Sequence, residues 1–291
     1  ITIKDFLAFY MARNVKRINL NNPHFPIDEY NLYDSKLLKQ SPLISIIIPT
    51  LNRYSYLSDL LNDLKEQDYN NFEIIIVDQS SPFKLEFYNN FQLNIRIIRQ
   101  KQKALWKARN TAIKRSAGSF ILLLDDDSRI KNNWLSEHIK CIDYFNADIS
   151  AGASLSLYGG KVPMHYSYFR WADQIDTGNC LIKRQVFKEC GLFDCQFEGL
   201  RMGDGEFGLR AHKQGFRNIN NPKASRFHLK VEFGGLREMG SWDGLRPNKI
   251  FSPRPIPSVL YFYRKYWGDK PTLYYLIQTI PMSLNPYKYK E

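Results

Sequence analysis

Several kinds of sequence signal are missing from this chain of 291 residues. No stretch approaches the ~20 consecutive apolar residues that a membrane-spanning helix needs, and no signal peptide is recognisable. No Walker loop is present, no Gly-x-Gly-x-x-Gly motif follows a strand, and there is no Gly-x-Ser-x-Gly nucleophile turn. Because a glycine cradle is missing, an anionic ligand is expected to be held by a metal ion and basic side chains.

Cysteine is also scarce. The chain contains four cysteines, Cys141, Cys180, Cys190 and Cys195, and none of them has the paired CxxC spacing. Cys190 and Cys195 have no His or Cys companion at metal-ligand spacing, so buried free thiols are predicted. Such thiols are typical of the reducing cytoplasm.

Charge is unevenly distributed along the chain, which carries a net charge of +12. Residues 41–209 hold 20 Lys and Arg against 20 Asp and Glu, whereas residues 210–291 hold 15 against five. A neutral core followed by a basic, aromatic tail predicts contact with an anionic surface or a phosphorylated partner. The alternative is an ordinary basic face in contact with solvent.

The pattern of apolar residues divides the chain into three parts. Residues 1–20 have the pattern of a basic amphipathic helix, and a polar linker follows them to residue 40. A catalytic domain is predicted over residues 41–230. Residues 231–291 are predicted to form a C-terminal helical and loop extension that contacts the acceptor or a membrane.

Short aliphatic runs alternate with helical patterns in the first half of the chain. Residues 104–117 are predicted to be a helix that Gly118 ends. Four strands that alternate with helices predict an α/β domain with a Rossmann-like, mostly parallel sheet flanked by helices. The runs that predict these buried strands are Leu43–Ile48, Phe72–Val77, Ile95–Ile98 and Phe120–Leu124.

The second half of the chain is less regular. Strands are expected at Asp148–Leu157 and Gly178–Lys183, and a short helix at Arg184–Cys190. A longer helix is expected from Glu206 to Gln214. Aromatic and basic residues are concentrated further on, in the segment Val259–Trp267.

Three consecutive carboxylates, Asp125–Asp127, follow the fourth predicted strand directly. Desolvating adjacent acids without partners is costly, and a divalent cation such as Mg²⁺ or Mn²⁺ would account for them. The alternative is a solvated Asp-rich turn. Because ligands of such sheets bind beyond the carboxyl ends of the strands, the loops Thr50–Arg53, Asp78–Ser81 and Asp125–Ser128 are expected to line one crevice.

An ordered set of motifs carries a family resemblance. The segments are Ser45–Arg53, Ile76–Ser81, Ala108–Asn110, Leu124–Asp127, Asp176–Asn179 and Gly203–Arg210. Over about residues 43–230 the chain resembles the GT-A glycosyltransferases of family 2, of the bacterial glycan-assembly type. The resemblance implies the GT-A fold and a metal-dependent, inverting, hexosyltransferase-type enzyme. The donor would be a UDP-, GDP- or dTDP-linked sugar, and the acceptor a hydroxyl group of a glycan or lipid-linked glycan.

The resemblance also implies which residues contact the donor. The loop after the first strand would touch the base and ribose, and Asp78 would accept a hydrogen bond from the base. Arg237, in a mobile loop that starts at Gly234, would close onto the diphosphate. The full set of donor-contacting residues is Pro49, Thr50, Asn52, Arg53, Asp78, Lys103, Arg109, Asp125, Asp126, Gly178, Asn179 and Arg237.

The same resemblance implies a metal site and a catalytic base. Asp125, Asp127 and His228 would bind Mn²⁺ or Mg²⁺, although His228 could instead be a structural histidine. Asp204 would be the general base that takes the proton of the acceptor hydroxyl. The family's usual Glu-Asp pair is Gly-Asp here, so Glu206 stays open as an alternative base, and Asp204 could instead cap a helix.

Other interpretations lead to different partners. Trp171, Asp173 and Asp176 could contact either sugar, although Trp171 could equally belong to the core. A nucleotidyltransferase acting on a sugar phosphate is one alternative, but the loop after the first strand lacks the expected glycines. A basic nucleic-acid-binding protein is another, and the neutral catalytic half argues against a nucleic-acid partner. The aromatic, basic tail predicts a cytoplasmic enzyme that associates peripherally with the anionic inner face of the membrane.

Overall fold

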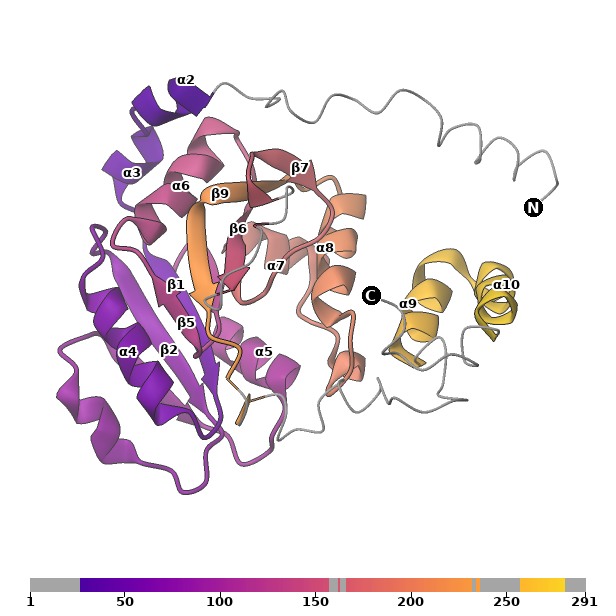
Figure 1. Ribbon diagram of the computed structural model, residues 1–291, viewed down its shortest axis with the longest axis horizontal. Helices are drawn as coiled ribbons and strands as arrows, with labels where there is room; N and C mark the ends of the chain where they lie inside the picture. The colour runs from indigo at the N-terminus through magenta and orange to yellow at the C-terminus, as the bar shows by residue number, and fades with distance from the viewer. Residues whose placement is uncertain (1–26, 157–161, 163–165, 232–233, 236–256, 281–291) are drawn as a thin grey trace. The chain divides into compact units, whose positions relative to one another are not determined.

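The computed structural model describes residues 27–156, 162, 166–231, 234–235 and 257–280 (Figure 1). The chain divides into two units, residues 1–33 and residues 34–291. In the first unit, helix α2 (Ile27–Leu32) is described. The predicted helix over residues 1–20 lies outside the described residues.

A nine-stranded mixed sheet forms the centre of the second unit. The strand order is β3-β2-β1-β4-β8-β6-β9-β5, and β7 also pairs with β9. The strands are β1 (Ile44–Thr50), β2 (Phe72–Asp78), β3 (Ile95–Arg99), β4 (Phe120–Leu124), β5 (Ser128–Ile130), β6 (Ile149–Ser156), β7 (Arg170–Ala172), β8 (Asn179–Lys183) and β9 (Asn218–His228).

Helices flank this sheet, as Figure 1 shows. Short 3₁₀ helices η1 (Leu85–Asn90) and η3 (Cys195–Phe197) lie in two of the connections. The α-helices of the second unit are α3 (Lys36–Gln40), α4 (Tyr54–Lys65), α5 (Leu105–Arg115), α6 (Trp134–Tyr144), α7 (Arg184–Cys190), α8 (Gly203–Lys213), α9 (Pro257–Trp267) and α10 (Asp269–Thr279).

The parallel half of the sheet confirms the prediction from the first half of the sequence. Strand β1 pairs in parallel with both β2 and β4, and β2 pairs in parallel with β3. Every residue of β1 is buried because helices cover both of its faces. Ile46 and Ile48 pack with the apolar face of α4, whereas Ile47 packs on the other side with α5. A strand that is covered on both faces has a continuous run of apolar residues in its sequence.

Several predicted boundaries were wrong. Helix α5 ends at Arg115, and Gly118 is not its cap. Gly118 instead lies against β1, where an added Cβ would come within 2.6 Å of the backbone nitrogen of Ser45. Strand β1 continues through Pro49 to Thr50, where β2 still pairs with it, whereas its pairing with β4 ends at Ile47. Helix α8 begins at Gly203, before the predicted Glu206, which puts Asp204 in its first turn.

Strands β5, β7 and β9 were not predicted. Strand β9 is rich in asparagine and contains Pro222, so it lacks the aliphatic pattern of a buried strand. Its first half pairs with β7 and its second half with β5, while β6 runs parallel to it with a register shift between Gly152 and Ser154. This strand brings His228 beside the acids that follow β4.

The C-terminal helices pack on the catalytic domain. Phe262 of α9 is buried in the same apolar cluster as Phe207 of α8, and the hydroxyl of Tyr261 donates to Asp194 at 2.7 Å. Tyr275 of α10 stacks on Tyr263 at 4.3 Å between ring centroids. Part of the aromatic segment therefore contributes to packing. Within the described chain, none of the helices is long and apolar enough to cross a membrane.

The cysteine prediction was partly wrong. Cys141, Cys180 and Cys190 are buried free thiols, but Cys195, at the start of η3, is exposed.

Candidate active site

Three loops at the carboxyl ends of β1, β2 and β4 meet as predicted. The backbone N–H of Asn52 donates to Ser80 Oγ at 2.8 Å, which joins the loops after β1 and β2. Thr50 Oγ1 donates to Asp126 Oδ2 at 2.8 Å, which joins the loops after β1 and β4. The polar loops therefore form one continuous edge at the end of the parallel strands.

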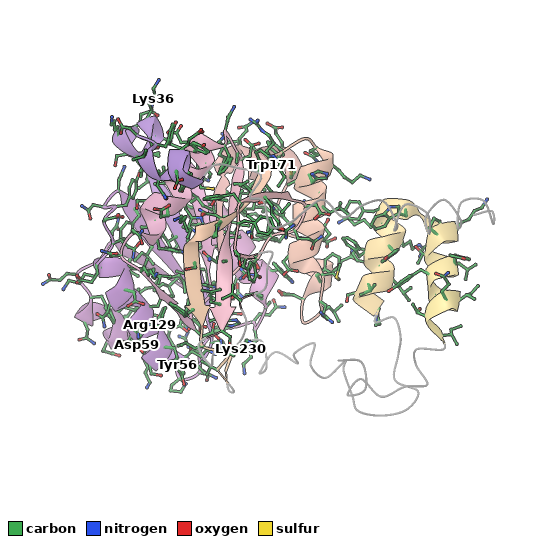
Figure 2. All side chains as sticks on the ribbon, turned by 45° about the horizontal axis from the view of Figure 1, so that its top comes forward. Lys36, Tyr56, Asp59, Arg129, Trp171 and Lys230 are labelled. Carbon is green, nitrogen blue, oxygen red and sulfur yellow. The ribbon has the colours of Figure 1, made fainter. Side chains whose placement is uncertain are left out.

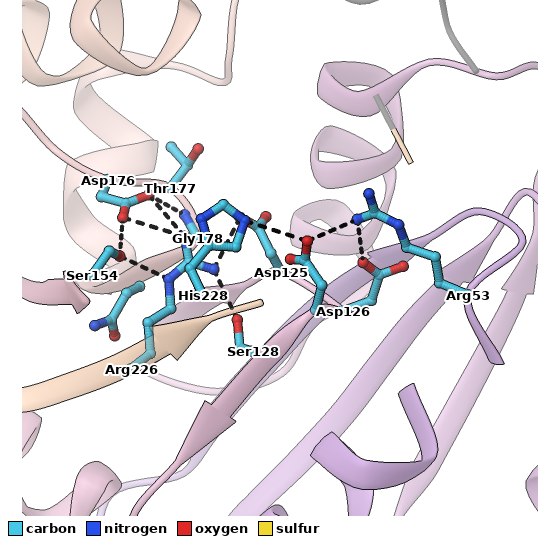
Figure 3. A network of polar contacts seen from close by, with 12 residues as sticks. Arg53, Asp125, Asp126, Ser128, Ser154, Asp176, Thr177, Gly178, Arg226 and His228 are labelled. Carbon is cyan, nitrogen blue, oxygen red and sulfur yellow. Dashed lines mark hydrogen bonds and ion pairs between the residues drawn. The ribbon is translucent and has the colours of Figure 1, made fainter. Parts of the chain in front are cut away.

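Asp125 pairs with two arginines, Arg109 and Arg226, of which Figure 3 labels Arg226. Arg109 Nη2 donates to its Oδ1 at 2.8 Å, and Arg226 Nη1 donates to its Oδ2 at 3.1 Å. Gly178 makes this arrangement possible, because a Cβ at that position would come within 2.1 Å of Asp125 and 2.2 Å of Arg226. The predicted donor contacts Arg109, Asp125 and Gly178 are thus neighbours.

Arg226 is the main site residue that the sequence analysis missed. Its side chain is 2% exposed, and it also donates to Ser128 Oγ at 2.8 Å and Ser154 Oγ at 2.8 Å. It pairs in addition with Asp176 at 3.3 Å. The only signal in the sequence was that Arg226 lies two residues before His228. In a strand, side chains two residues apart point to the same side of the sheet.

Asp126 and Asp127 share the guanidinium of Arg53. Arg53 Nη1 lies 3.1 Å from an oxygen of each carboxylate, and the three side chains are at most 10% exposed. Arg53 Nη2 also donates to the carbonyl of Gly234 at 3.3 Å. Gly234 was predicted to begin a mobile loop with Arg237, and Arg237 lies outside the described residues.

The two acids differ in their ionisation. Burial raises the pKa of Asp126 to about 7, against the opposing charge of Arg53. Burial would also raise the pKa of Asp127, but the hydrogen bond and charge of His228, together with Arg53, hold it at about 2. Of the two acids, Asp127 therefore keeps its negative charge down to the lower pH.

Asp127 and His228, two of the three predicted metal ligands, lie next to each other. His228 Nε2 lies 3.3 Å from Asp127 Oδ2, and the histidine ring is 34% exposed. Asp125, the third predicted ligand, is directed to its two arginines instead, and the described residues contain no cluster of three or more metal-ligating side chains. A carboxylate and an imidazole fit a Mn²⁺ or Mg²⁺ ion whose other ligands are water and substrate phosphates.

Asp78 lies at the end of β2 and is almost fully buried. Its carboxylate accepts hydrogen bonds from the hydroxyls of Tyr54 at 2.7 Å and Tyr88 at 2.8 Å, and from the backbone N–H of Ser80 at 2.8 Å. The sequence analysis did not single out either tyrosine. Their bonds fix the orientation of Asp78 at the edge where the nucleotide base was predicted.

Two other predicted donor contacts lie apart from this cluster. The side chain of Asn179 is fully buried and directed into the sheet, where it accepts from Trp134 Nε1 at 2.9 Å and donates to two backbone carbonyls. Its side-chain hydrogen bonds join β6, β8 and β9, and its predicted contact with the donor stays a prediction. Lys103 is exposed in the loop before α5.

The two candidate bases on α8 have different surroundings. Glu206 is fully buried and is bound by Arg210 at 3.0 Å, Lys265 at 2.9 Å and the hydroxyl of Tyr266 at 2.7 Å. Asp204 accepts a hydrogen bond from the N–H of Gly205 at 2.8 Å. Within the described chain no cation lies within ion-pair distance of Asp204. Burial raises the pKa of Asp204 above its ordinary value.

Comparisons with known proteins agree on the type of domain. A family model described as "Glycosyl transferase family 2" matches residues 45–199. The chain is 32% identical over 127 residues to the poly(ribitol-phosphate) beta-N-acetylglucosaminyltransferase TarS of Staphylococcus aureus, which covers 41% of this chain but only 22% of that protein.

Solved structures show the same fold at lower identity. S. aureus TarS 1–349 in complex with UDP-GlcNAc matches with a TM-score of 0.59 at 18% identity, over 82% of this chain and 80% of that one. The mannosyltransferase PcManGT from Pyrobaculum calidifontis, in complex with GDP-Man and Mn²⁺, matches with a TM-score of 0.58 at 14% identity, over 88% and 79% of the two chains. The predicted GT-A fold is confirmed.

Proposed function

Since the chain belongs to glycosyl transferase family 2, we propose that it transfers a sugar from a nucleoside diphosphate sugar to a hydroxyl group of a glycan or lipid-linked glycan. The observation that carries this proposal is the cluster Asp125–Asp127 at the end of β4, beside the loops that follow β1 and β2. Such an edge of a parallel sheet is where this class of fold binds nucleotides.

The nucleotide is assigned to the loops after β1 and β2. Asp78 presents its carboxylate there, held by two tyrosine hydroxyls, and is suited to accept a hydrogen bond from a base N–H. Thr50 and Asn52 shape the same edge through their bonds to Asp126 and Ser80. Arg109 is assigned to the diphosphate, and its Nε is buried without a hydrogen-bond partner among the described residues.

A divalent cation, Mn²⁺ or Mg²⁺, is assigned to Asp127 and His228, with Asp125 beside them. When bound, it would neutralise the charge that builds on the leaving diphosphate. The proximity of His228 Nε2 to Asp127 Oδ2, at 3.3 Å, supports this assignment because it brings one imidazole and one carboxylate ligand together. The Mn²⁺ in the structure of PcManGT is consistent with it.

Asp204 is assigned as the general base of an inverting transfer. The acceptor oxygen attacks the anomeric carbon while the bond from that carbon to the diphosphate oxygen breaks, and its electron pair leaves with the nucleoside diphosphate. The proton of the acceptor hydroxyl passes to Asp204. A raised pKa suits this role because a base is most effective when its pKa approaches the working pH.

The C-terminal helices support a second part of the proposal, peripheral association with an anionic membrane. Residues 210–291 carry a net charge of +10. Helix α10 exposes an apolar set that alternates at helical spacing, Leu273, Tyr274, Ile277 and Ile280. Basic and apolar side chains together favour binding at an anionic interface. Sedimentation with anionic and neutral liposomes at low and high salt checks it, and equal, negligible binding to both would exclude it.

The activity itself is tested by hydrolysis and transfer with a panel of UDP-, GDP- and dTDP-sugars. The expected result is release of nucleoside diphosphate from one donor class in Mn²⁺ or Mg²⁺. EDTA should abolish that release, and Asp127→Ala should abolish turnover and weaken nucleoside diphosphate binding. Full activity in excess EDTA would contradict the metal assignment. Release of pyrophosphate from a nucleoside triphosphate and a sugar phosphate would instead indicate a nucleotidyltransferase.

A further inference from the structure

A cavity of about 430 Å³ lies beside the acidic cluster, between β6, β7 and β9. Asp176, which pairs with Arg226, forms part of its wall and so belongs to both the cavity and the cluster. The volume falls in the ~300–1,000 Å³ range of small-molecule sites. The polar and aromatic side chains of the wall are Tyr166, Tyr168, Arg170, Gln174, Asp176 and Asn220.

Strand alternation explains why these side chains gather. Tyr168, Arg170 and Ala172, at every second position in and before β7, line the cavity. The intervening Phe169 and Trp171 turn to the other side, where their rings lie 5.0 Å and 6.2 Å from the ring of Phe145. Trp171, which Figure 2 labels, is 45% exposed. It is therefore not part of the cavity, whereas Arg170 is.

Arg170 contributes an unneutralised charge to the cavity wall. Its Nε is buried, and within the described residues it has no hydrogen-bond partner. Asp176, the one acid in the wall, is already paired with Arg226 and accepts the N–H of Gly178 at 2.9 Å. Among the described residues the cavity wall therefore has one cation more than available anions, and a buried donor without a partner is costly.

The cavity also lies next to the proposed base. Gln174 approaches the first turn of α8 so closely that a Cβ on Gly205 would come within 2.7 Å of its Oε1. Gly205 follows Asp204 directly in the chain. Burial and the negative charge of Asp176, with a smaller effect of Asp204, raise the pKa of Tyr166. A molecule in this cavity is thus near the group that receives the acceptor's proton.

We propose that this cavity binds an anionic group of the acceptor, a phosphate or a carboxylate, and that Arg170 pairs with it. The proposal rests on the proposed function and narrows the acceptor to a charged glycan. An arginine fork binds either anion through two parallel hydrogen bonds. A neutral hydroxyl in place of the anion would leave the guanidinium of Arg170 without a charged partner in the cavity.

Binding of three matched probes tests the proposal without requiring turnover. Methyl glucoside, methyl glucoside 6-phosphate and methyl glucuronide have the same ring and differ in charge at one carbon. Calorimetric titration into the full chain, with and without saturating UDP, measures each dissociation constant. One or both anionic probes should bind about tenfold or more tightly than the neutral probe, and the preferred one identifies phosphate or carboxylate as the group recognised.

Variants assign the preference to Arg170. Arg170→Gln should remove the difference between anionic and neutral probes, and Arg170→Lys, which keeps the charge but loses the fork, should restore part of it. Lys65→Gln removes one exposed positive charge on α4 and should leave the difference unchanged. Because Arg170 has no ion pair among the described residues, its replacement should not lower the melting temperature.

Two results would overturn the proposal. One is equal binding of charged and neutral probes, or a preference that survives in Arg170→Gln. The other is displacement of the anionic probe by UDP, which would place the anion in the donor site. UDP binding in the same titrations separates this result from a failure of the proposed function. If none of UDP, GDP and dTDP binds while the Arg170-dependent preference is present, the donor assignment fails and the anion site stands.

Discussion

Two groups of carboxylates, the acids that follow β4 and the acids of α8, are held in different ways. The acids that follow β4 are all paired, Asp125 with two arginines and both Asp126 and Asp127 with Arg53. On α8 the pairing is uneven. Glu206 has two cations and a tyrosine hydroxyl, whereas Asp204, two residues earlier, accepts the N–H of its own neighbour.

This difference separates carboxylates that stabilise the structure from one that is available for proton transfer. Burial alone would raise the pKa of Asp125 and Asp127, but the charges beside them lower it and hold both acids in their charged form, whereas Asp126 shares Arg53 with Asp127 and its pKa stays raised. Asp204 is desolvated with less compensation, so its pKa is raised. It is not the N-cap of α8, because that position is Met202 in the left-handed region at a φ of 79°. The positive end of the helix dipole nevertheless favours an anion at its position.

The largest expected effect is on activity. Asp204→Asn should lower kcat about 10²- to 10⁴-fold, since general base catalysis contributes that much, and should leave donor binding and the melting temperature nearly unchanged. Steady-state kinetics with the identified donor, together with titration of the nucleoside diphosphate, measures both. If Asp204→Asn stays active while Glu206→Gln is inactive, the role of base moves to Glu206.

The next effect is on stability and concerns the paired group. Arg226→Met should lower the free energy of unfolding by about 3 kcal/mol, the low end for breaking a buried ion pair, because Asp125 and Asp176 remain about a third exposed. Urea unfolding measures the change. The control is Arg129→Met, which breaks an exposed pair with Asp63 and should cost less than ~1 kcal/mol. Equal losses in the two variants would contradict the view that the acids after β4 depend on their buried partners.

The acids after β4 were predictable from the sequence because they follow a buried strand whose position local pattern determines. The parallel strands read as apolar runs, and the rule that ligands bind at their carboxyl ends located Asp78 and Asp125–Asp127 correctly. The pairing of these acids was not predictable. Arg226 reaches Asp125 from a strand 101 positions further along the chain, and no local pattern distinguishes it from a surface arginine.

The second half of the sheet escaped prediction for a physical reason. Strand β9 is stabilised by side-chain amides rather than aliphatic packing. Asn221 donates to Ser150 Oγ at 3.1 Å, and Asn220 donates to the carbonyl of Tyr168 at 3.1 Å. A period-2 apolar pattern is therefore missing, and the cavity beside β7 went unnoticed with it. The alternation of residues 166–172 is present in the sequence. It could be assigned to a cavity side and a packed side only because the structure shows that Phe169 and Trp171 pack against Phe145.

The smallest expected effect concerns Glu206. It tests whether the ion pairs of Glu206 stabilise the fold rather than take part in catalysis. Glu206→Gln keeps the shape of the side chain but removes the charge that Arg210 and Lys265 pair with. We expect a loss of about 1–3 kcal/mol in the free energy of unfolding, faster amide hydrogen exchange in α9, and less than a tenfold change in kcat. Lys265→Met is the matched control, since it breaks the link between α9 and α8 without touching an acid on α8 and should speed exchange in α9 similarly. Unchanged exchange in both variants would mean that the apolar contacts of Phe262 hold α9 in place without this ion pair.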